Sequence, residues 1–436
     1  MKILMFPSDR GGGFGHISRC LVVAREARSR GHACAIVLSD RKYERLVGDR
    51  FPLFFAKGPG SRETKLLGFV KKVLRRNFEP RPLYVGISGL DYQVVRDGLD
   101  SHETVKSILS EYERVVIDFK PDMMIGDTNL LVWILSRRTC IPALQIVRYA
   151  SHPATGNLVW WEEQPSAMKP PDWRQVFNPI LDGLGISGIE KVETLLSGDL
   201  YIVPSIPEIE PIPQDDVTFH VGQLSVNDQK EQDPVWFRKV DRSQPLVYIT
   251  IGGGAGPVGN KLFFRTVIEA FGSADIQVIV STSAKFGKRD FGNLPKNVKV
   301  FQWVPGTFMI SKSDLVIFHG GYGTMMECLA YGKPSIVVPY QTEQEGNGRR
   351  LEKLGCGRVI MLSRENCKII GAWWKQGAYS FCVQNRYDLN SEELTRSVSE
   401  VLQNDKYSEN ARRLQSRIKE YGGSKKVLEV IEQRWA

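Results

Sequence analysis

The segment from Asp314 to Pro339 joins a buried strand, DLVIF, to a glycine turn, HGGYGT, and then to an amphipathic stretch, MMECLAYG. Glycines let the backbone approach a phosphate, and the first amides of the following helix, together with its dipole, stabilise negative charge. His319 and Thr324 can add side-chain donors, and Glu327, one helical turn further on, suits a ribose hydroxyl pair. The segment therefore predicts a site for a phosphorylated nucleoside, with a tight turn and a structural histidine as the alternative.

Two segments flanking this turn carry side chains suited to a base and to a polyol. Trp303 follows the run VKVFQ and offers a flat apolar face for a base, although a lone tryptophan in that place can also be a core residue. Glu343 and Gln344 fall in the loop after the next expected strand, at the carboxyl edge where α/β folds bind ligands. A carboxylate and an amide in tandem suit sugar hydroxyls, which both donate and accept hydrogen bonds.

Two stretches of chain alternate short apolar runs with longer amphipathic ones, as parallel doubly wound sheets do. In the first stretch we expect strands at Lys2 to Phe6, Cys34 to Leu38, Pro52 to Ala56, Met123 to Gly126 and Ala143 to Val147, with helices at His16 to Arg30 and His102 to Phe119. In the second we expect strands at Leu246 to Ile251, Gln277 to Ser281, Val298 to Gln302, Leu315 to Phe318 and Ser335 to Val338. Residues 148–215 do not show this alternation.

The fold class predicted from this pattern is α/β, with two Rossmann-like doubly wound parallel-sheet domains facing a cleft. The expected domains are residues 1–225 and 226–408, with the hinge between them near residues 222–240. Residues 409–436 are expected to form helices that pack back toward the first domain.

Composition agrees with two domains of ordinary size. The chain has 436 residues, 42% of them hydrophobic and 25% charged, and no apolar run long enough to span a bilayer, which favours a soluble, cytoplasmic protein. A formal charge of +9 favours anionic partners, and nucleic acid is disfavoured because no recognition module accompanies the basic residues. Seven scattered cysteines without a Cys-x-x-Cys pair support neither a disulfide framework nor a zinc site.

Taken together, the residues between Trp303 and Gly355, which we call the donor segment, resemble the signature of UDP-glycosyltransferases with the GT-B fold. The resemblance is closest to bacterial enzymes that glycosylate antibiotics and to the transferase that adds N-acetylglucosamine to lipid-linked peptidoglycan precursor. The matching residues are Trp303, Val304, Pro305, His319, Gly320, Gly321, Tyr322, Gly323, Thr324, Glu327, Gly332, Pro334, Pro339, Glu343, Gln344, Asn347 and Gly355. Many relatives carry glutamine where this chain has Gly306.

The resemblance assigns a donor-binding role to each part of this signature. It implies base stacking for Trp303 beside Val304, diphosphate contact for His319, Gly321, Gly323 and Thr324, ribose contact for Glu327, and donor-sugar contact for Glu343 and Gln344. A further turn, Gly252 to Gly254 after the run PLVYITI, is expected to approach the donor from the other side through Gly253 and Gly254.

A second glycine turn, GGGFGHISR, follows the first expected strand and opens the first helix, so that His16 would face the cleft beside Gly15. In the family that the donor segment resembles, the histidine of a Gly-His pair at this place is the general base for an acceptor hydroxyl. The resemblance implies this role for His16, and for Asp127 that of orienting the imidazole. An unperturbed imidazole pKa of about 6.5 suits a general base near neutral pH. A helix-capping role is the alternative for His16.

The predicted activity is an inverting, metal-independent transfer of a sugar from a nucleotide sugar, UDP in the first instance, to a hydroxyl of a small-molecule or lipid-like acceptor. No separate cofactor is expected. Because Gly13 to Arg19 also resemble the Gly-x-Gly-His-x-x-Arg signature of a UDP-sugar hydrolase, a hydrolase or epimerase of the same fold is the alternative. Two further alternatives remain. One is a dinucleotide-dependent oxidoreductase, suggested by Gly11, Gly13, Gly15 and Asp40, and the other is a non-catalytic nucleotide-sugar binding protein.

The acceptor side carries less specific signals. Residues 62–81 have apolar positions at helical spacing with basic residues between them, and such a helix either lies on an anionic membrane or packs on its own domain. Tryptophans outside the donor signature suit either an acceptor ring or a packed core, namely Trp160, Trp161, Trp173, Trp373 and Trp374.

Overall fold

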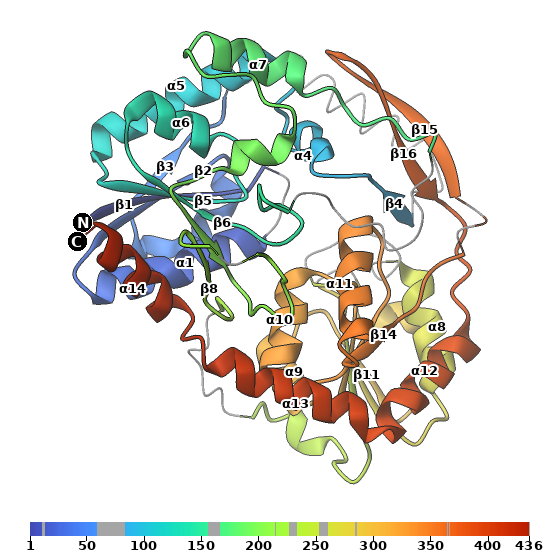
Figure 1. Ribbon diagram of the computed structural model, residues 1–436. Helices are drawn as coiled ribbons and strands as arrows, with labels where there is room; N and C mark the ends of the chain where they lie inside the picture. Colours follow the sequence, from blue (N-terminus) through green and yellow to red (C-terminus); the bar gives the residue numbers. More distant parts are fainter. Residues whose placement is uncertain are drawn as a thin grey trace.

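The computed structural model describes residues 1–436 except 11–13, 59–82, 156–165, 214, 226–232, 253–259, 284–285, 364, 366 and 436. In this part of the chain the strands form two parallel sheets and one small antiparallel sheet (Figure 1). The predicted strands lie where the alternation placed them, with ends that differ by one or two residues. The predicted α/β class with two parallel-sheet domains is confirmed.

The first sheet has seven strands in the order β3-β2-β1-β5-β6-β7-β8, and all its pairs are parallel. Its strands are β1 (Lys2–Pro7), β2 (Ala33–Leu38), β3 (Leu53–Phe55), β5 (Met123–Asp127), β6 (Ala143–Ile146), β7 (Leu200–Val203) and β8 (Thr218–His220). Helices in this half are α1 (Phe14–Ser29), α2 (Glu44–Val47), α4 (Asp91–Arg96), α5 (His102–Phe119), α6 (Val132–Thr139) and α7 (Arg174–Asp182). Because helices cover both faces, the central strands are apolar on both sides.

The second sheet has six parallel strands in the order β11-β10-β9-β12-β13-β14. They are β9 (Leu246–Thr250), β10 (Gln277–Ser281), β11 (Val298–Phe301), β12 (Leu315–Phe318), β13 (Ser335–Val337) and β14 (Gly357–Val359). Helices α9 (Gly306–Lys312), α10 (Tyr322–Ala330) and α13 (Asp405–Lys419) cover one face, and α8 (Lys261–Phe271) and α12 (Ser391–Gln403) cover the other. Helix α11 (Thr342–Lys353) joins β13 to β14.

The end of the chain returns to the first sheet. Helix α13 packs against α10, whereas α14 (Ser424–Trp435) packs against α1, so both chain termini lie on the same side of the molecule (Figure 1). The apolar face of α14, with Val427, Leu428 and Ile431 buried, belongs to the core below β1. The structure thus places the terminal helices on both halves of the molecule.

The third sheet joins the two halves, and its strands were not among the predicted ones. The hairpin β15 (Cys367–Trp374) and β16 (Gly377–Gln384) follows β14 and pairs with β4 (Tyr84–Gly86), a segment of the first half (Figure 1). Val85 of β4 also bridges to Gln341, just before α11. Trp373, at the hairpin end, is 82% exposed, whereas Trp173 is buried.

Several other expectations concern parts of the chain that the structure describes only partly. The basic segment 62–81 lies outside the described residues, as do Trp160 and Trp161. In the described ranges, no helix combines the length and apolar character needed to cross a bilayer. Cys20, Cys34, Cys140, Cys328 and Cys356 are free thiols.

A glycine in α11 sets how closely that helix packs on the second sheet. A Cβ added at Gly348 would lie 2.6 Å from Val359 Cγ2 and 2.9 Å from Val337 Cβ, two side chains without room to retreat. We expect Gly348→Ala to destabilise the protein by about 1–3 kcal/mol through overpacking, measured as a drop in thermal midpoint. Gly371→Ala on the exposed β15 is the control, because an added Cβ there meets no atom within 4 Å. Equal midpoints for the two variants would contradict this packing.

Candidate active site

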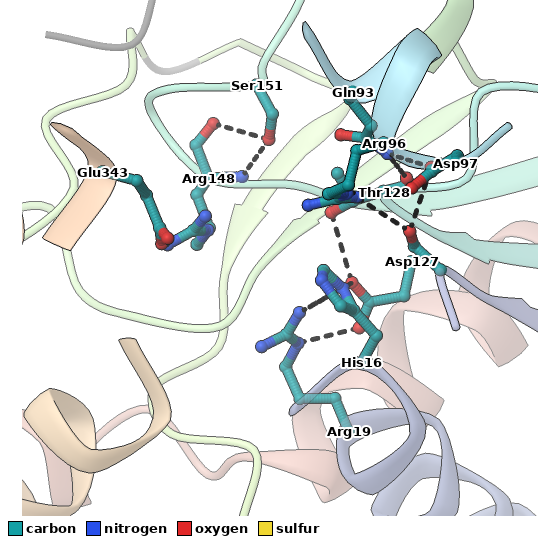
Figure 2. A network of polar contacts seen from close by, with 11 residues as sticks. His16, Arg19, Gln93, Arg96, Asp97, Asp127, Thr128, Arg148, Ser151 and Glu343 are labelled. Carbon is teal, nitrogen blue, oxygen red and sulfur yellow. Dashed lines mark hydrogen bonds and ion pairs between the residues drawn. The ribbon is translucent and has the colours of Figure 1, made fainter. Parts of the chain in front are cut away.

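The predicted base and its predicted partner meet at the carboxyl edge of the first sheet. His16 lies in the first turn of α1, and Asp127 is the last residue of β5. Because β1 and β5 are neighbours, with Pro7 opposite Asp127, the two side chains reach each other. His16 Nδ1 lies 2.7 Å from Asp127 Oδ1 (Figure 2).

Asp127 is fully buried and is held from a second side by Arg19, one helical turn after His16. Arg19 Nε donates to Asp127 Oδ2 at 2.7 Å and Nη2 donates to Oδ1 at 2.7 Å. Burial alone would raise the pKa of this carboxyl, but the charges of Arg19 and His16 outweigh it and lower the pKa to about 2. Asp127 is therefore ionised throughout the physiological range.

The backbone after Asp127 is strained. Thr128 has φ 53°, a left-handed conformation that a β-branched residue rarely adopts. Gln93 Nε2, on α4, donates to the Thr128 carbonyl at 2.7 Å, and Thr128 Oγ1 donates to Asp127 Oδ1 at 3.3 Å. Gln93 also donates to Asp97, which Arg96 contacts (Figure 2). These bonds stabilise the strained turn that aims the Asp127 carboxylate at His16.

Opposing effects act on the imidazole of His16, and burial is the largest of them. Burial lowers the pKa of His16, the contact with Asp127 raises it, and the nearby cations Arg19 and Arg96 lower it again, with a net result below the ordinary 6.5. His16 is thus neutral at neutral pH and can accept a proton.

The predicted phosphate turn has the geometry of an anion site. Helix α10 begins directly after the turn, with Gly321 as its N-cap and without a side chain that caps its first amides. Gly320 has φ 87°, and its carbonyl accepts a hydrogen bond from Asn347 Nδ2 at 2.8 Å. The first amides of α10 are therefore directed away from the sheet, where an anion can bind them.

Two glycines make room for the imidazole of His319 at this turn. A Cβ at Gly321 would lie 2.5 Å from His319 Nε2, and one at Gly252 would lie 2.8 Å from His319 Cε1. The ring also stacks on Tyr340, with centroids 6.0 Å apart and planes 15° apart. Packing therefore fixes the ring of His319 beside the start of α10. The predicted Gly253 and Gly254 follow directly after Gly252 and lie outside the described residues.

The residues predicted to contact the base and the ribose, Trp303 and Glu327, come before and after α9 in the chain. Trp303 is 69% exposed before α9, whereas its neighbour Val304 is buried. Glu327 lies on α10, which packs against α9, and burial raises its pKa to about 7, although a hydrogen bond with Thr307 lowers it. An exposed indole just before α9 and a partly buried carboxyl on α10 are thus available to a ligand.

Glu343 joins the two halves of the molecule. It lies in the first turn of α11, which begins at Thr342, so the predicted loop is in fact a helix start. Arg148, which follows β6 of the first sheet, donates from Nη1 to Glu343 Oε1 at 2.7 Å (Figure 2). The guanidinium also lies over the ring of Tyr322, 4.5 Å from its centroid, and the Tyr322 hydroxyl donates to the Pro204 carbonyl. The carboxyl edges of the two sheets therefore meet at this ion pair.

Gln344, the other predicted sugar contact, has a different environment. Its side chain is buried, and its Oε1 accepts a hydrogen bond from the Tyr340 amide at 3.1 Å. The adjacent Glu345 is fully buried and accepts a hydrogen bond from the Tyr84 hydroxyl of β4 at 2.7 Å. Gln344 therefore shapes the turn before α11 in this structure, and Glu343 presents its carboxylate toward the first sheet.

The structure brings the predicted site residues together in two groups. His16, beside Gly15, lies with Asp127 on the first sheet. On the second, His319, Gly321, Gly323, Thr324 and Glu327 lie in the turn before α10 or on α10 itself, and Trp303 and Val304 precede α9. The sequence prediction missed Arg148, Gln93 and Thr128, which no local motif marks. In the described ranges, no group of three or more His, Cys, Asp or Glu side chains is placed to hold a metal ion.

Two parallel-sheet domains whose carboxyl edges meet define the GT-B class of fold. Residues 265–376 match the model of the erythromycin biosynthesis protein CIII-like C-terminal domain. The oleandomycin glycosyltransferase of Streptomyces antibioticus is 22% identical over 96% of this chain and 88% of its own length. An uncharacterized glycosyltransferase of Methanosarcina mazei is 24% identical over 99% of this chain and 98% of its own.

Solved structures agree with the fold. The calicheamicin glycosyltransferase CalG4 superposes with a TM-score of 0.69 at 19% identity, over 99% of this chain and 97% of the other. The spinosyn rhamnosyltransferase SpnG, whose complex contains thymidine diphosphate, superposes with a TM-score of 0.67 at 17% identity, over 99% of this chain and 100% of the other. Together with the sequence relatives, these structures show a glycosyltransferase with the GT-B fold, similar to the antibiotic glycosyltransferases.

The environment of His16 predicts the pH dependence of transfer. Because its pKa lies below 6.5 in the folded protein, the neutral form persists to lower pH than for a free imidazole. At saturating donor, so that the titration of Glu327 does not affect donor capture, we expect the acidic limb of kcat/KM for the acceptor to have its midpoint below 6.5 if His16 is the base that loses activity on protonation. Initial rates between pH 4.5 and 8.5 measure this, and a midpoint above 6.5 would contradict the assignment.

Proposed function

We propose that the chain catalyses inverting, metal-independent transfer of a sugar from a pyrimidine nucleoside diphosphate to an acceptor hydroxyl. The UDP sugar is the first candidate donor. The thymidine diphosphate bound to the structurally similar SpnG supports a TDP sugar as the second. The carrying observation is the His16–Asp127 contact of 2.7 Å on the sheet edge that meets the second domain. A small-molecule aglycone is the proposed acceptor class, in line with the aglycone bound to SpnG.

The proposed reaction is a single displacement at the anomeric carbon. His16 Nε2 accepts the proton of the acceptor hydroxyl as its oxygen attacks, and the bond from the anomeric carbon to the diphosphate oxygen breaks. Asp127, ionised and bonded to Nδ1, stabilises the imidazolium that forms. The departing diphosphate takes the negative charge, which the first amides of α10 and the adjacent His319 stabilise.

The second domain supplies the remaining contacts in this proposal. Trp303 stacks on the base, Glu327 accepts hydrogen bonds from the ribose hydroxyls, and Glu343 contacts the donor sugar. Glu343 keeps its charge for this role because Arg148 lowers its pKa against the opposing effect of burial. The Gln344 side chain shapes the turn before α11, so in this proposal it supports the sugar site through the backbone.

Replacing the base separates catalysis from donor binding. We expect His16→Ala to reduce the rate of transfer about 10²- to 10⁴-fold, the usual contribution of a positioned base, while the dissociation constant for UDP or TDP changes less than about twofold, since the nucleotide contacts lie on the other domain. Turnover and calorimetric titration measure the two quantities.

The matched control for this variant is His102→Ala, a histidine at the start of α5 whose side chain is 43% exposed and pairs with Glu103. It should retain full activity. Loss of nucleotide binding in His16→Ala would instead place His16 in the donor site. If the sugar donor is consumed by water at the full rate without acceptor, the activity is hydrolysis, the alternative that the Gly13 to Arg19 segment suggests.

The raised pKa of Glu327 predicts how nucleotide affinity changes with pH. Only the ionised carboxylate accepts both ribose hydroxyls, and with a pKa of about 7 it is mostly protonated at pH 6 and mostly ionised at pH 8. We expect the affinity of the wild type for UDP, relative to Glu327→Gln, to rise roughly tenfold between these values. Comparison with the variant cancels the titration of the ligand phosphate. Parallel pH profiles for the two proteins would exclude ribose recognition by the ionised Glu327.

A further inference from the structure

Arg19 is a buried cation that a histidine and aspartate pair does not by itself require. It lies on α1 three residues after His16, so both side chains occupy the same helix face. Its side chain is 9% exposed, and both Nε and Nη2 are engaged by the Asp127 carboxylate. Two of the five N–H donors of this guanidinium are thus directed at the aspartate.

We propose that Arg19 is a positioning residue for the reaction, which fixes the orientation of Asp127 and thereby decides which ring nitrogen of His16 carries the proton. This inference rests on the proposed role of His16 as the base. It also gives the arginine of the segment Gly13 to Arg19 a role that does not depend on whether an alcohol or water is the acceptor.

The first part of the argument is the orientation of the carboxylate. Arg19 contacts both Asp127 oxygens with a two-point geometry that a guanidinium fork suits and a single ammonium does not. With both oxygens held, Oδ1 is fixed 2.7 Å from His16 Nδ1. Thr128 and Gln93 hold the backbone of the same turn. The carboxylate therefore cannot rotate away from the ring without losing two charge-assisted bonds.

The second part is the choice of tautomer. His16 Nδ1 lies 2.7 Å from Asp127 Oδ1, an acceptor, and 2.9 Å from Arg19 Nη2, a donor. If Nδ1 accepted from Arg19, Nε2 would carry the proton and could not act as a base. Nη2 carries two hydrogens, and one of them is directed to Oδ1 at 2.7 Å. The ionised Oδ1 lies closer to Nδ1 than Nη2 does and is the stronger partner for a proton on Nδ1. Nε2 is then left with its lone pair.

The third part is the charge around the ring. The groups that face His16 are Asp127 at the end of β5, Arg19 on α1, Arg96 on α4 and Glu343 on α11. Asp127 and Glu343 favour the imidazolium, and the two arginines oppose it. Since Arg19 neutralises Asp127 at contact distance, removal of Arg19 leaves an uncompensated carboxylate that favours the protonated ring.

The test compares pH profiles and rates of Arg19→Met and Arg19→Lys. We expect Arg19→Met to move the acidic limb of kcat/KM up by about one pH unit or more and to lower kcat about tenfold or more at pH 7, with donor KM nearly unchanged. Arg19→Lys should recover the charge but only part of kcat, because it cannot contact both oxygens. Arg96→Met is the matched control, a nearby cation without a contact to Asp127, and should shift the limb less.

A double-mutant cycle keeps the proposal testable if Arg19→Met folds poorly with a buried, unpaired carboxylate. In Arg19→Met combined with Asp127→Asn both charges are removed, and kcat should match that of Asp127→Asn alone within about threefold. Nitrogen-15 NMR of the histidines reads the tautomer without turnover. Wild type should show Nδ1 protonated and Nε2 bare, and folded Arg19→Met a mixture.

Three results would overturn the role of Arg19: an unmoved acidic limb in folded Arg19→Met, rate losses for Arg19→Met and Asp127→Asn that multiply in the double variant, or an Arg96→Met shift as large as that of Arg19→Met. These failures differ from failure of the proposed function. If His16→Ala retained transfer, the base itself would be wrong, whatever the Arg19 variants did.

Discussion

The burial of an ionised carboxylate at the end of β5 is the constraint that organises the first domain. A buried charge costs several kcal/mol unless it is paired and hydrogen-bonded, and Asp127 has no exposed surface. Its partners both come from the first turn and a half of α1, so the helix must begin just after β1 with a defined rotation. The left-handed Thr128 that follows Asp127 is the backbone cost of aiming the carboxylate at that helix.

The first domain stabilises a negative charge of its own, whereas the second domain must bind a negative charge that belongs to a ligand. It does so with backbone amides, because glycines at the turn before α10 exclude side chains and let the His319 ring pack against the chain. The ion pair between Arg148 and Glu343 connects the two domains. Arg148 of the first domain lowers the pKa of Glu343 and keeps it ionised, so the charge of a residue in the second domain depends on a residue of the first.

Local patterns predicted ten of the thirteen described strands of the two parallel sheets and the glycine turn at Gly320, because strand periodicity and turn chemistry depend on neighbouring residues. They missed the short strands β7, β8 and β14. They also placed His16 and Asp127 in one site through a resemblance. They could not predict Arg148 as the partner of Glu343, which is 195 residues away, or the left-handed Thr128, because these depend on how distant elements pack. The strand β4 was missed for the same reason, since its partner β16 comes from the other half of the chain.

That hairpin limits how the two halves can move. The backbone amides of Leu83 and Val85 donate to the carbonyls of Gln384 and Tyr340, and the Ile87 amide donates to Thr342 Oγ1 at the start of α11. Residues 83–87 therefore move with the second sheet although they precede α4 in the chain. Movement of the first sheet relative to the second must be absorbed on either side of this segment, along the connection from β8 to β9, and between α13 and α14, where Gly422 and Gly423 have left-handed conformations. Because α4 carries Gln93, a displacement after residue 87 would reach the Thr128 turn directly, and the geometry of Asp127 is coupled to the position of the helix that carries Glu343.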